Sequence, residues 1–356
     1  DLAIKFLTSL LTVVYSFGAP TKPIDLKAMW DPNGLDYLED SIKTLMDEKI
    51  LIPEAEYNKI MDDLSPLDDF LRKEYEEDKT WMFRHLKAIA EITPQDSVLN
   101  LGAKGAGFLA NNLAKKGVQN VVGVSPDFPN IMAAKKYARK ESLKTVNFIH
   151  AKPHNISSIC FANKFNVFLT EQFCSGIFDE RILESVIFAK DNLLSANARF
   201  IPQGFDVKVF AYNTNVHRDM LQESKEFETL YGLKFDSLAT ALKKHLMGIY
   251  TRFDEKELLK LSEDYTLKSF DFKTLSTSAF TQDITITISS PGILSGFLCY
   301  FDVKLPNDNS VTNSPFDLKT KYMQKAFVTA SKKYYKPGDR LTLRAQYDSN
   351  FTLELI

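Results

Sequence analysis

Between residues 97 and 202, short apolar segments alternate with amphipathic helical segments, and this rhythm constrains the fold more than any other feature of the chain. We expect strands at residues 98–101, 118–124, 146–150, 165–169 and 199–202, and helices at 108–116, 129–140 and 180–193. Strands that alternate with helices of about ten residues or more predict parallel βαβ units. The segment therefore predicts a doubly wound parallel sheet, an α/β fold.

The preceding residues show a helical pattern. From residue 34 to about 93, apolar side chains recur at helical spacing, for example at Leu35, Leu38 and Ile42. The full length of 356 residues fits roughly two domains. We therefore expect an N-terminal helical extension at residues 1–93, followed by a Rossmann-like domain at residues 94–202.

The pattern changes again after residue 203. Short β-rich segments at 207–212, 283–289, 296–303, 322–328 and 340–347 are separated by turn signals, which predicts a second domain at 203–356, a β-barrel or a sandwich. A helical insert interrupts it at about 216–264, with apolar residues at Leu238, Leu242, Leu246, Ile249 and Tyr250. Such an insert is either an oligomerisation arm or a helix that packs on its own domain.

Composition places the chain among ordinary folded proteins, with 44% hydrophobic and 25% charged residues, and excludes a disordered chain. The formal net charge of −2 conceals an acidic stretch at 36–78 and a basic stretch at 319–344. Each stretch is either a solvated face or a binding surface.

Cysteine usage indicates the compartment. Cys160, Cys174 and Cys299 have neither metal nor redox spacing, so we expect a reducing, cytoplasmic location and no metal site. Residues 2–19 are apolar but lack a basic leader. Their helical spacing favours a docked or partner-binding amphipathic helix over a membrane anchor.

The strand at 165–169 leads into a loop that is bracketed by Glu171 and Glu180, nine positions apart. The carboxyl ends of strands are where open α/β sheets bind their ligands. Two carboxylates there suit a planar cation such as guanidinium. The alternative is that each glutamate is a helix cap or a solvated group.

From about residue 78 to the end, the chain resembles the protein arginine methyltransferases. The resemblance rests on the order of its junctions: Val98-Leu-Asn-Leu-Gly, Val121-Val-Gly-Val, the loop from Thr170 to Glu180, Phe200-Ile-Pro and Leu230-Tyr-Gly-Leu. It implies a class I (Rossmann-like) S-adenosylmethionine methyltransferase domain, then a β-barrel domain with an inserted helical dimerisation arm. In that family the paired glutamates hold the substrate guanidinium toward the methyl group of S-adenosylmethionine, so that positioning and exclusion of water supply most of the rate.

The resemblance assigns the remnant catalytic positions to Glu171 and Glu180, and the cofactor-binding positions to Gly102, Gly105, Gly107 and Ser125. The Gly-rich loop departs from the family's Gly-x-Gly-x-Gly because it is one residue longer, with Lys104 inserted.

Ser125 replaces the acidic residue that accepts both ribose hydroxyls in the family. Loss of two charge-assisted hydrogen bonds of ~1.5 to 3 kcal/mol each weakens cofactor binding at least about a hundredfold. Asp127 is an alternative acceptor, but Pro126 and Pro129 stiffen that stretch.

Further departures affect the rest of the site. His154 stands where the family carries a glutamate near the adenine. Thr320-Lys321-Tyr322 replaces the Thr-His-Trp signature, and Gln172-Phe173-Cys174 replaces the Trp-Met-Gly of the arginine tunnel. Cys174 is interpreted as a small buried thiol rather than a nucleophile. Together the departures predict that S-adenosylmethionine binds weakly or not at all.

We therefore expect a catalytically impaired prozyme subunit that pairs with and activates a catalytic arginine methyltransferase through an arm at about 230–261. The complex, a heterodimer or heterotetramer, would act on Arg/Gly-rich proteins. The alternative is an active, divergent arginine methyltransferase. A third hypothesis is a scaffold for Arg-rich or RNA-associated proteins, although no interleaving of aromatic and basic residues of the RNA-binding type is evident.

Overall fold

The computed structural model describes residues 71–356, except 74, 153–155, 157–160, 162, 216–225, 227, 228, 231, 233–245, 254, 318, 319, 330 and 331. The described residues form two compact units. The first, termed the α/β unit, contains those of 71–77, 85–171 and 188–201. The second, termed the β unit, contains those of 78–84, 172–187 and 202–356.

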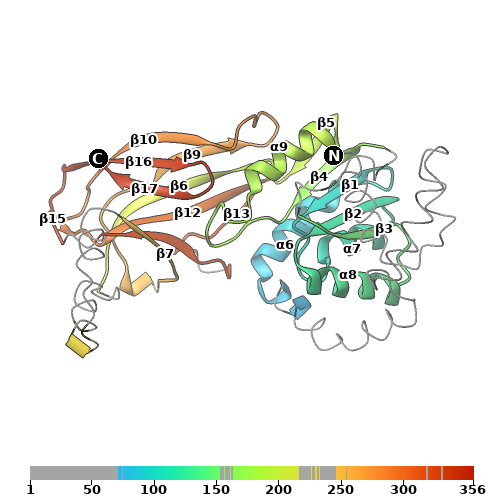
Figure 1. Ribbon diagram of the computed structural model, residues 1–356, viewed down its shortest axis with the longest axis horizontal. Helices are drawn as coiled ribbons and strands as arrows, with labels where there is room; N and C mark the ends of the chain where they lie inside the picture. Colours follow the sequence, from blue (N-terminus) through green and yellow to red (C-terminus); the bar gives the residue numbers. More distant parts are fainter. Residues whose placement is uncertain are drawn as a thin grey trace. The chain divides into compact units, whose positions relative to one another are not determined.

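The α/β unit is built on a parallel sheet in the order β3-β2-β1-β4-β5 (Figure 1). The strands are β1 (Ser97–Leu101), β2 (Asn120–Ser125), β3 (Val146–His150), β4 (Phe165–Thr170) and β5 (Leu194–Ile201). The predicted doubly wound sheet is confirmed. Only β5 differs by more than two residues at its start, which lies at Leu194 rather than at 199.

Two helices pack side by side against β2 and β3, α7 (Phe108–Lys115) and α8 (Phe128–Lys140) (Figure 1). The local sequence explains where α8 begins. The Asp127 carboxylate accepts a hydrogen bond from the backbone N–H of Asn130, and Pro129 lies in the first turn, where no intrahelical donor is needed. A further helix, α9 (Ile182–Asn192), lies between β4 and β5 in the chain.

The described part of the N-terminal extension is helical. Residues 71–73 and 75–77 are helical, followed by α6 (Lys79–Ala88) and the short η2 (Ile89–Glu91). The helices expected between 34 and 70, and the apolar segment 2–19, lie outside the described residues.

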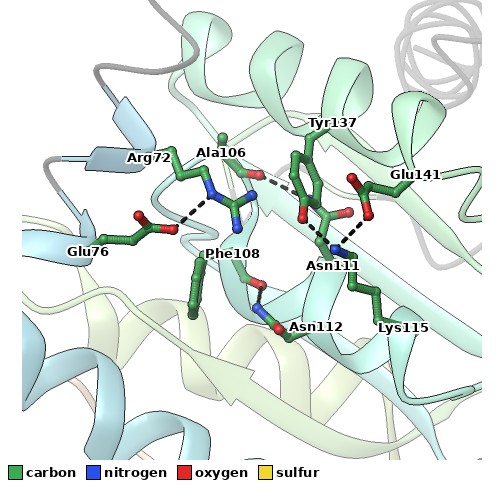
Figure 2. Close-up of polar contacts among 9 residues, drawn as sticks. All are labelled: Arg72, Glu76, Ala106, Phe108, Asn111, Asn112, Lys115, Tyr137 and Glu141. Atoms are coloured by element: carbon green, nitrogen blue, oxygen red, sulfur yellow. Dashed lines mark hydrogen bonds and ion pairs between the residues drawn. The ribbon is translucent and has the colours of Figure 1, made fainter.

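Residues 71–77 are fastened to α7 and α8 through Arg72 (Figure 2). Its guanidinium lies 4.2 Å from the ring centroid of Tyr137 and 5.6 Å from that of Phe108. Glu76 pairs with Arg72 at 2.9 Å. A cation between two aromatic rings is held by their electron-rich faces, so this contact fixes the segment close to the start of α7.

The β unit consists of antiparallel sheets. The largest runs β7-β14-β12-β6-β8, with β13 on β12 and β9 on β6; a second runs β10-β16-β17, and β11 pairs with β15 (Figure 1). Where a β-barrel or sandwich was expected, the described strands form these three antiparallel sheets. Their bounds are β6 (Gly204–Asn213), β7 (Met247–Thr251), β8 (Leu259–Lys260), β9 (Tyr265–Asp271), β10 (Phe280–Thr287), β11 (Gly292–Ile293), β12 (Gly296–Leu305), β13 (Asn309–Thr312), β14 (Gln324–Val328), β15 (Tyr334–Tyr335), β16 (Arg340–Tyr347) and β17 (Phe351–Leu355).

The helical insert expected at 216–264 needs correction at its C-terminal end. Ile249 and Tyr250 lie in strand β7, opposite Ala326 and Lys325 of β14, and η5 (Glu255–Glu257) and β8 follow. Pairing with an existing sheet edge decides the conformation of this short apolar run, because strand preference depends on the neighbouring strand. Leu238 and Leu242 lie outside the described residues. No helix among the described residues is long and apolar enough to cross a membrane.

Candidate functional site

The α/β unit places two of the predicted site segments at the switch point of its sheet. From β1 the chain proceeds to β2 and β3 on one side and then returns to β4 on the other side. Ligand sites of doubly wound sheets lie at the carboxyl ends of the strands where the order reverses. The Gly-rich loop at 102–107 follows β1, and Glu171 follows β4.

Glu171 is fully buried, and its carboxylate is bound by the chain itself. Its Oε1 accepts a 2.9 Å hydrogen bond from Asn100 Nδ2, and its Oε2 accepts one of 2.8 Å from the Tyr75 hydroxyl. The backbone N–H of Lys104 donates to the same carboxylate. Burial raises the pKa of Glu171 to about 7, and the hydrogen bonds from Asn100 and Tyr75 oppose that rise. The carboxyl group is therefore partly protonated near neutral pH.

The Gly-rich loop is left-handed at Gly105, where φ is +56°, and it lies directly against Tyr75. A Cβ added at Gly105 would lie 2.5 Å from Cβ and Cγ of Tyr75. Only glycine tolerates both this backbone conformation and this close approach. The ring of Tyr75 also lies 5.2 Å from that of Phe108, so residues 71–77 cover this end of the loop.

The backbone amides of the loop are engaged by neighbouring protein atoms. The N–H groups of Gly102 and Ala103 donate to the Val124 carbonyl at 2.8 and 3.0 Å. The Asn130 side chain accepts from the Ala106 N–H at 2.8 Å and donates to the Ala103 carbonyl. With the Lys104 N–H bound to Glu171, four amides of the loop at 102–107 have partners inside the α/β unit.

Ser125, at the carboxyl end of β2, is buried, and its hydroxyl accepts a 3.2 Å hydrogen bond from the Asp127 N–H. The Asp127 carboxylate accepts from Asn130 N–H at 3.3 Å as the cap of α8. One oxygen of this alternative acceptor therefore caps the helix. His154 lies outside the described residues. Within the described ranges, no group of three or more His, Cys, Asp or Glu side chains could hold a metal ion.

Glu180 belongs to the β unit, whereas Glu171 belongs to the α/β unit. Glu180 is half-buried, and its backbone carbonyl accepts a 2.9 Å hydrogen bond from Gln172 Nε2. The same nitrogen donates to Ser185 Oγ at 3.1 Å. Gln172 therefore ties the two ends of the loop 172–180 together.

Two aromatic side chains anchor the loop 172–180 in the core of the β unit. Phe173 packs 5.7 Å from Trp81 and 5.5 Å from Phe301, measured between ring centroids. Phe178 stacks on Tyr347 at 4.6 Å. Between them Ile177 has φ +68°, a conformation that a β-branched residue adopts only under constraint. Anchors on both sides fix this strained loop.

A polar contact holds the end of the same loop. Asp179 accepts a hydrogen bond from the Tyr250 hydroxyl and lies 3.7 Å from Lys325 Nζ. The hydrogen bond to Asp179, together with burial, raises the pKa of Tyr250 to about 12. Cys174 in this loop is half-buried and forms no disulfide.

The segment Thr320-Lys321-Tyr322 is bound to the start of α6 within the β unit. The backbone N–H of Lys321 donates to Asp78 Oδ2 at 2.8 Å, and the rings of Tyr322 and Trp81 lie 4.8 Å apart. The other oxygen of Asp78 accepts from the Trp81 N–H, so Asp78 joins the two segments. The Lys321 side chain is exposed.

Sequence reasoning missed several residues that shape the site. Asn100 could have been identified from the sequence, because it is the one polar residue inside the apolar run at 98–101. No sequence pattern identifies Tyr75, Asp78 or Asn130 as site residues, because each contacts a segment that is distant in the chain.

Comparisons with known proteins agree with this fold. Residues 209–352 match the family model of the arginine methyltransferase oligomerization subdomain. The chain is 23% identical over 267 residues to probable protein arginine N-methyltransferase 3 of Oryza sativa subsp. japonica, and 22% identical over 241 residues to protein arginine N-methyltransferase 6 of Xenopus tropicalis. These matches cover 65% and 64% of this chain, and 42% and 68% of the two relatives. The match therefore spans less than half the length of the rice relative.

Two solved structures share the fold. One is the Trypanosoma brucei PRMT1 enzyme–prozyme heterotetrameric complex with AdoHcy, with a TM-score of 0.65 and 16% identity, covering 78% of this chain and 90% of that chain. The other is Arabidopsis thaliana protein arginine methyltransferase 10, with a TM-score of 0.62 and 19% identity, covering 77% and 88%.

A doubly wound sheet followed by an antiparallel oligomerization subdomain defines a methyltransferase-type architecture. Over the matched segments the chain is similar to the protein arginine methyltransferases, a family of transferases.

Proposed function

We propose that this chain is a catalytically impaired, prozyme-type subunit, which pairs with and activates a catalytic protein arginine methyltransferase. The proposal rests on the hydrogen bonds that the buried Glu171 carboxylate already accepts within its own unit. Its carboxylate accepts hydrogen bonds from Tyr75, Asn100 and the Lys104 N–H, all from its own unit.

A carboxylate that binds guanidinium must offer both free lone pairs and a negative charge. Three donors already take three of the about four lone-pair sites of the Glu171 carboxylate, and burial raises its pKa to about 7. The protonated fraction offers no ion pair to an arginine. Glu171 therefore works against substrate binding here, and we interpret Glu171 and Glu180 as remnants of a catalytic pair.

The residues present do not fit S-adenosylmethionine. A cofactor at the Gly-rich loop needs open backbone and, at the end of β2, an acceptor for the ribose hydroxyls. Here the Tyr75 ring lies against Gly105, four amides of the loop are bonded within the unit, and Ser125 supplies a hydroxyl that already accepts a hydrogen bond. We propose that Gly102, Gly105, Gly107 and Ser125 bind the cofactor weakly or not at all.

Pairing is supported by two similarities. The matched family model is an oligomerization subdomain, and one structural neighbour is an enzyme–prozyme heterotetrameric complex. We propose a heterodimer or heterotetramer in which this chain contributes the arm predicted at about 230–261, of which 231, 233–245 and 254 lie outside the described residues and 247–251 form β7. The complex would methylate Arg/Gly-rich proteins in the cytoplasm.

The test is to purify this chain and a candidate catalytic methyltransferase separately and together, and to assay methylation of an Arg/Gly-rich peptide. We expect activity in the mixture well above that of either chain alone. Glu180→Gln in this chain should leave the mixture active, whereas the matching substitution in the partner should abolish activity. The proposal is rejected if this chain alone is active. It is also rejected if Glu180→Gln in this chain abolishes the activity of the mixture.

One observation favours the alternative, an active divergent arginine methyltransferase. Both glutamates are retained, and Gly102, Gly105 and Gly107 all have the positive φ that favours glycine. Isothermal titration of the isolated chain with S-adenosylmethionine and S-adenosylhomocysteine separates the two hypotheses. Micromolar binding supports the active enzyme, and absence of heat up to millimolar cofactor supports the prozyme.

A further inference from the structure

The turn at 332–340 of the β unit concentrates exposed cations. Lys332, Lys333, Lys336 and Arg340 are all exposed. Asp339 is the only acid in this stretch of sequence, and its carboxylate accepts the Lys336 backbone N–H at 2.8 Å. The turn therefore carries an excess of positive charge on its surface.

The turn is held rigidly by the backbone. The N–H of Leu294 donates to the Lys333 carbonyl at 3.0 Å, and Gly338 N–H donates to the Ile288 carbonyl at 2.9 Å. The N–H of Ile288 donates back to the Asp339 carbonyl at 2.8 Å. Because the backbone is already ordered, a ligand that binds here does not have to order it.

An aromatic ring lies among these cations. Tyr334 is 56% exposed and pairs in register with Ile293 of β11, which is 43% exposed. The local sequence is Lys332-Lys-Tyr-Tyr-Lys336. Basic residues therefore flank a pair of aromatic residues in this turn, and exposure distinguishes Tyr334 from its buried neighbour Tyr335.

The surface continues along β16. Arg340, Thr342, Arg344 and Gln346 alternate with buried residues and so share one face of the strand, over a length of ~20 Å. An open hollow of about 560 Å³ lies at the far end of that face. It is lined by Thr281, Gln282, Asp283, Arg344 and Gln346. Arg344 is paired with Asp283 by two 2.8 Å hydrogen bonds, so the hollow presents mainly neutral polar groups.

We propose that the turn at 332–340 and the adjoining face of β16 bind a single-stranded polynucleotide. The four cations neutralise phosphates, and the Tyr334 ring stacks on an unpaired base. The amide and hydroxyl groups of the hollow hydrogen-bond to sugar or base edges. An acidic protein segment would use the cations, but its carboxylates do not stack on Tyr334 as every base of a single strand can, and a duplex would keep its bases stacked on one another. The inference is independent of whether the chain transfers methyl groups.

The test is fluorescence anisotropy of the full chain with labelled single strands of the same mixed sequence, one RNA and one DNA. Binding should fall with salt, with a slope of log affinity against log salt of about −2.8 if all four cations contact phosphates. Lys336→Ala/Arg340→Ala should reduce that slope by about 1.4. Tyr334→Ala should weaken binding about tenfold, whereas Tyr334→Phe should retain it.

A matched control removes two exposed lysines elsewhere in the β unit, Lys256→Ala/Lys273→Ala, and should leave affinity unchanged. Circular dichroism and thermal melting show that each variant is folded. Tighter binding of RNA than DNA, or the reverse, identifies the source of the strand. The proposal is overturned by absence of binding at 50 mM salt, by an equal loss in the control, by an unchanged affinity of Tyr334→Ala, or by oligoglutamate or duplex RNA binding as tightly as the single strand.

Discussion

The hydroxyl of Tyr75 donates a 2.8 Å hydrogen bond to the buried carboxylate of Glu171, across 96 positions of sequence. The bond joins the helical segment before α6 to the carboxyl end of β4, and it lies at the Gly-rich loop of the sheet. Tyr75 therefore links the N-terminal segment, the loop and the remnant catalytic carboxylate in one contact.

Tyr75→Phe should destabilise the α/β unit by about 1.5 to 3 kcal/mol at pH 8, because the ring is kept and a hydrogen bond to a buried charged group is lost. Urea unfolding measures the change. Tyr137→Phe is the control, since the Tyr137 hydroxyl accepts from Lys115 at the surface, and little change is expected (Figure 2). Equal effects of the two substitutions would contradict the importance of the contact with Glu171.

Glu171→Gln should stabilise the protein increasingly as the pH rises. Because the pKa of Glu171 is raised to about 7 in the folded state from 4.5, the folded protein binds more protons than the unfolded chain between these values. The contribution of Glu171 to the free energy of unfolding of the wild type is therefore lost as the pH rises from 4.5 to about 7, by on the order of 3 kcal/mol. The amide is neutral throughout. Unfolding curves at pH 5 and pH 8 measure the difference, and a pH-independent difference would count against a buried, neutralised carboxyl group.

Gly105→Ala should destabilise the protein far more than Gly117→Ala. Both glycines have positive φ, +56° and +93°, so each alanine bears backbone strain of about 1 kcal/mol. Only Gly105 also has Tyr75 atoms 2.5 Å from the added Cβ, whereas Gly117 has nothing within 4 Å. We expect a total loss above ~3 kcal/mol at Gly105, measured by thermal melting. Similar melting temperatures would show that Tyr75 does not cover the loop in solution.

Asp179→Asn should lower the pKa of Tyr250 from about 12 toward the ordinary value of a tyrosine. The hydrogen bond to a carboxylate favours the protonated phenol, and the amide removes that charge. Ultraviolet titration at alkaline pH follows the phenolate, and a difference spectrum against Tyr250→Phe assigns the signal. A titration that is unchanged in Asp179→Asn would show that the loop end does not contact β7.

The sheet of the α/β unit was predictable from sequence because its strands are buried on both faces and read as short apolar runs. Residues 146–150 were predicted with the bounds that β3 has. Ile249 and Tyr250 were misassigned because the same apolar residues suit a helix or a strand, and their pairing with β14 lies about 75 positions away in sequence.

The site was predictable in part for a related reason. Glycines and paired glutamates are local signals, so Gly105 and Glu171 could be identified from the chain alone. The donors that occupy Glu171 could not, since Tyr75 reaches it through tertiary packing. Asn130 likewise acts on the Gly-rich loop from a different helix.

The ring of Phe148 on β3 restricts how this part of the molecule can evolve. A Cβ at Gly107 would lie 2.4 Å from that ring, and a Cβ at Gly123 would lie 2.6 Å from it. Neither glycine can gain a side chain while the phenylalanine remains. Substitutions at positions 107, 123 and 148 therefore depend on one another. A homologue with a small residue in place of Phe148 is the one in which a side chain at position 123 first becomes tolerable.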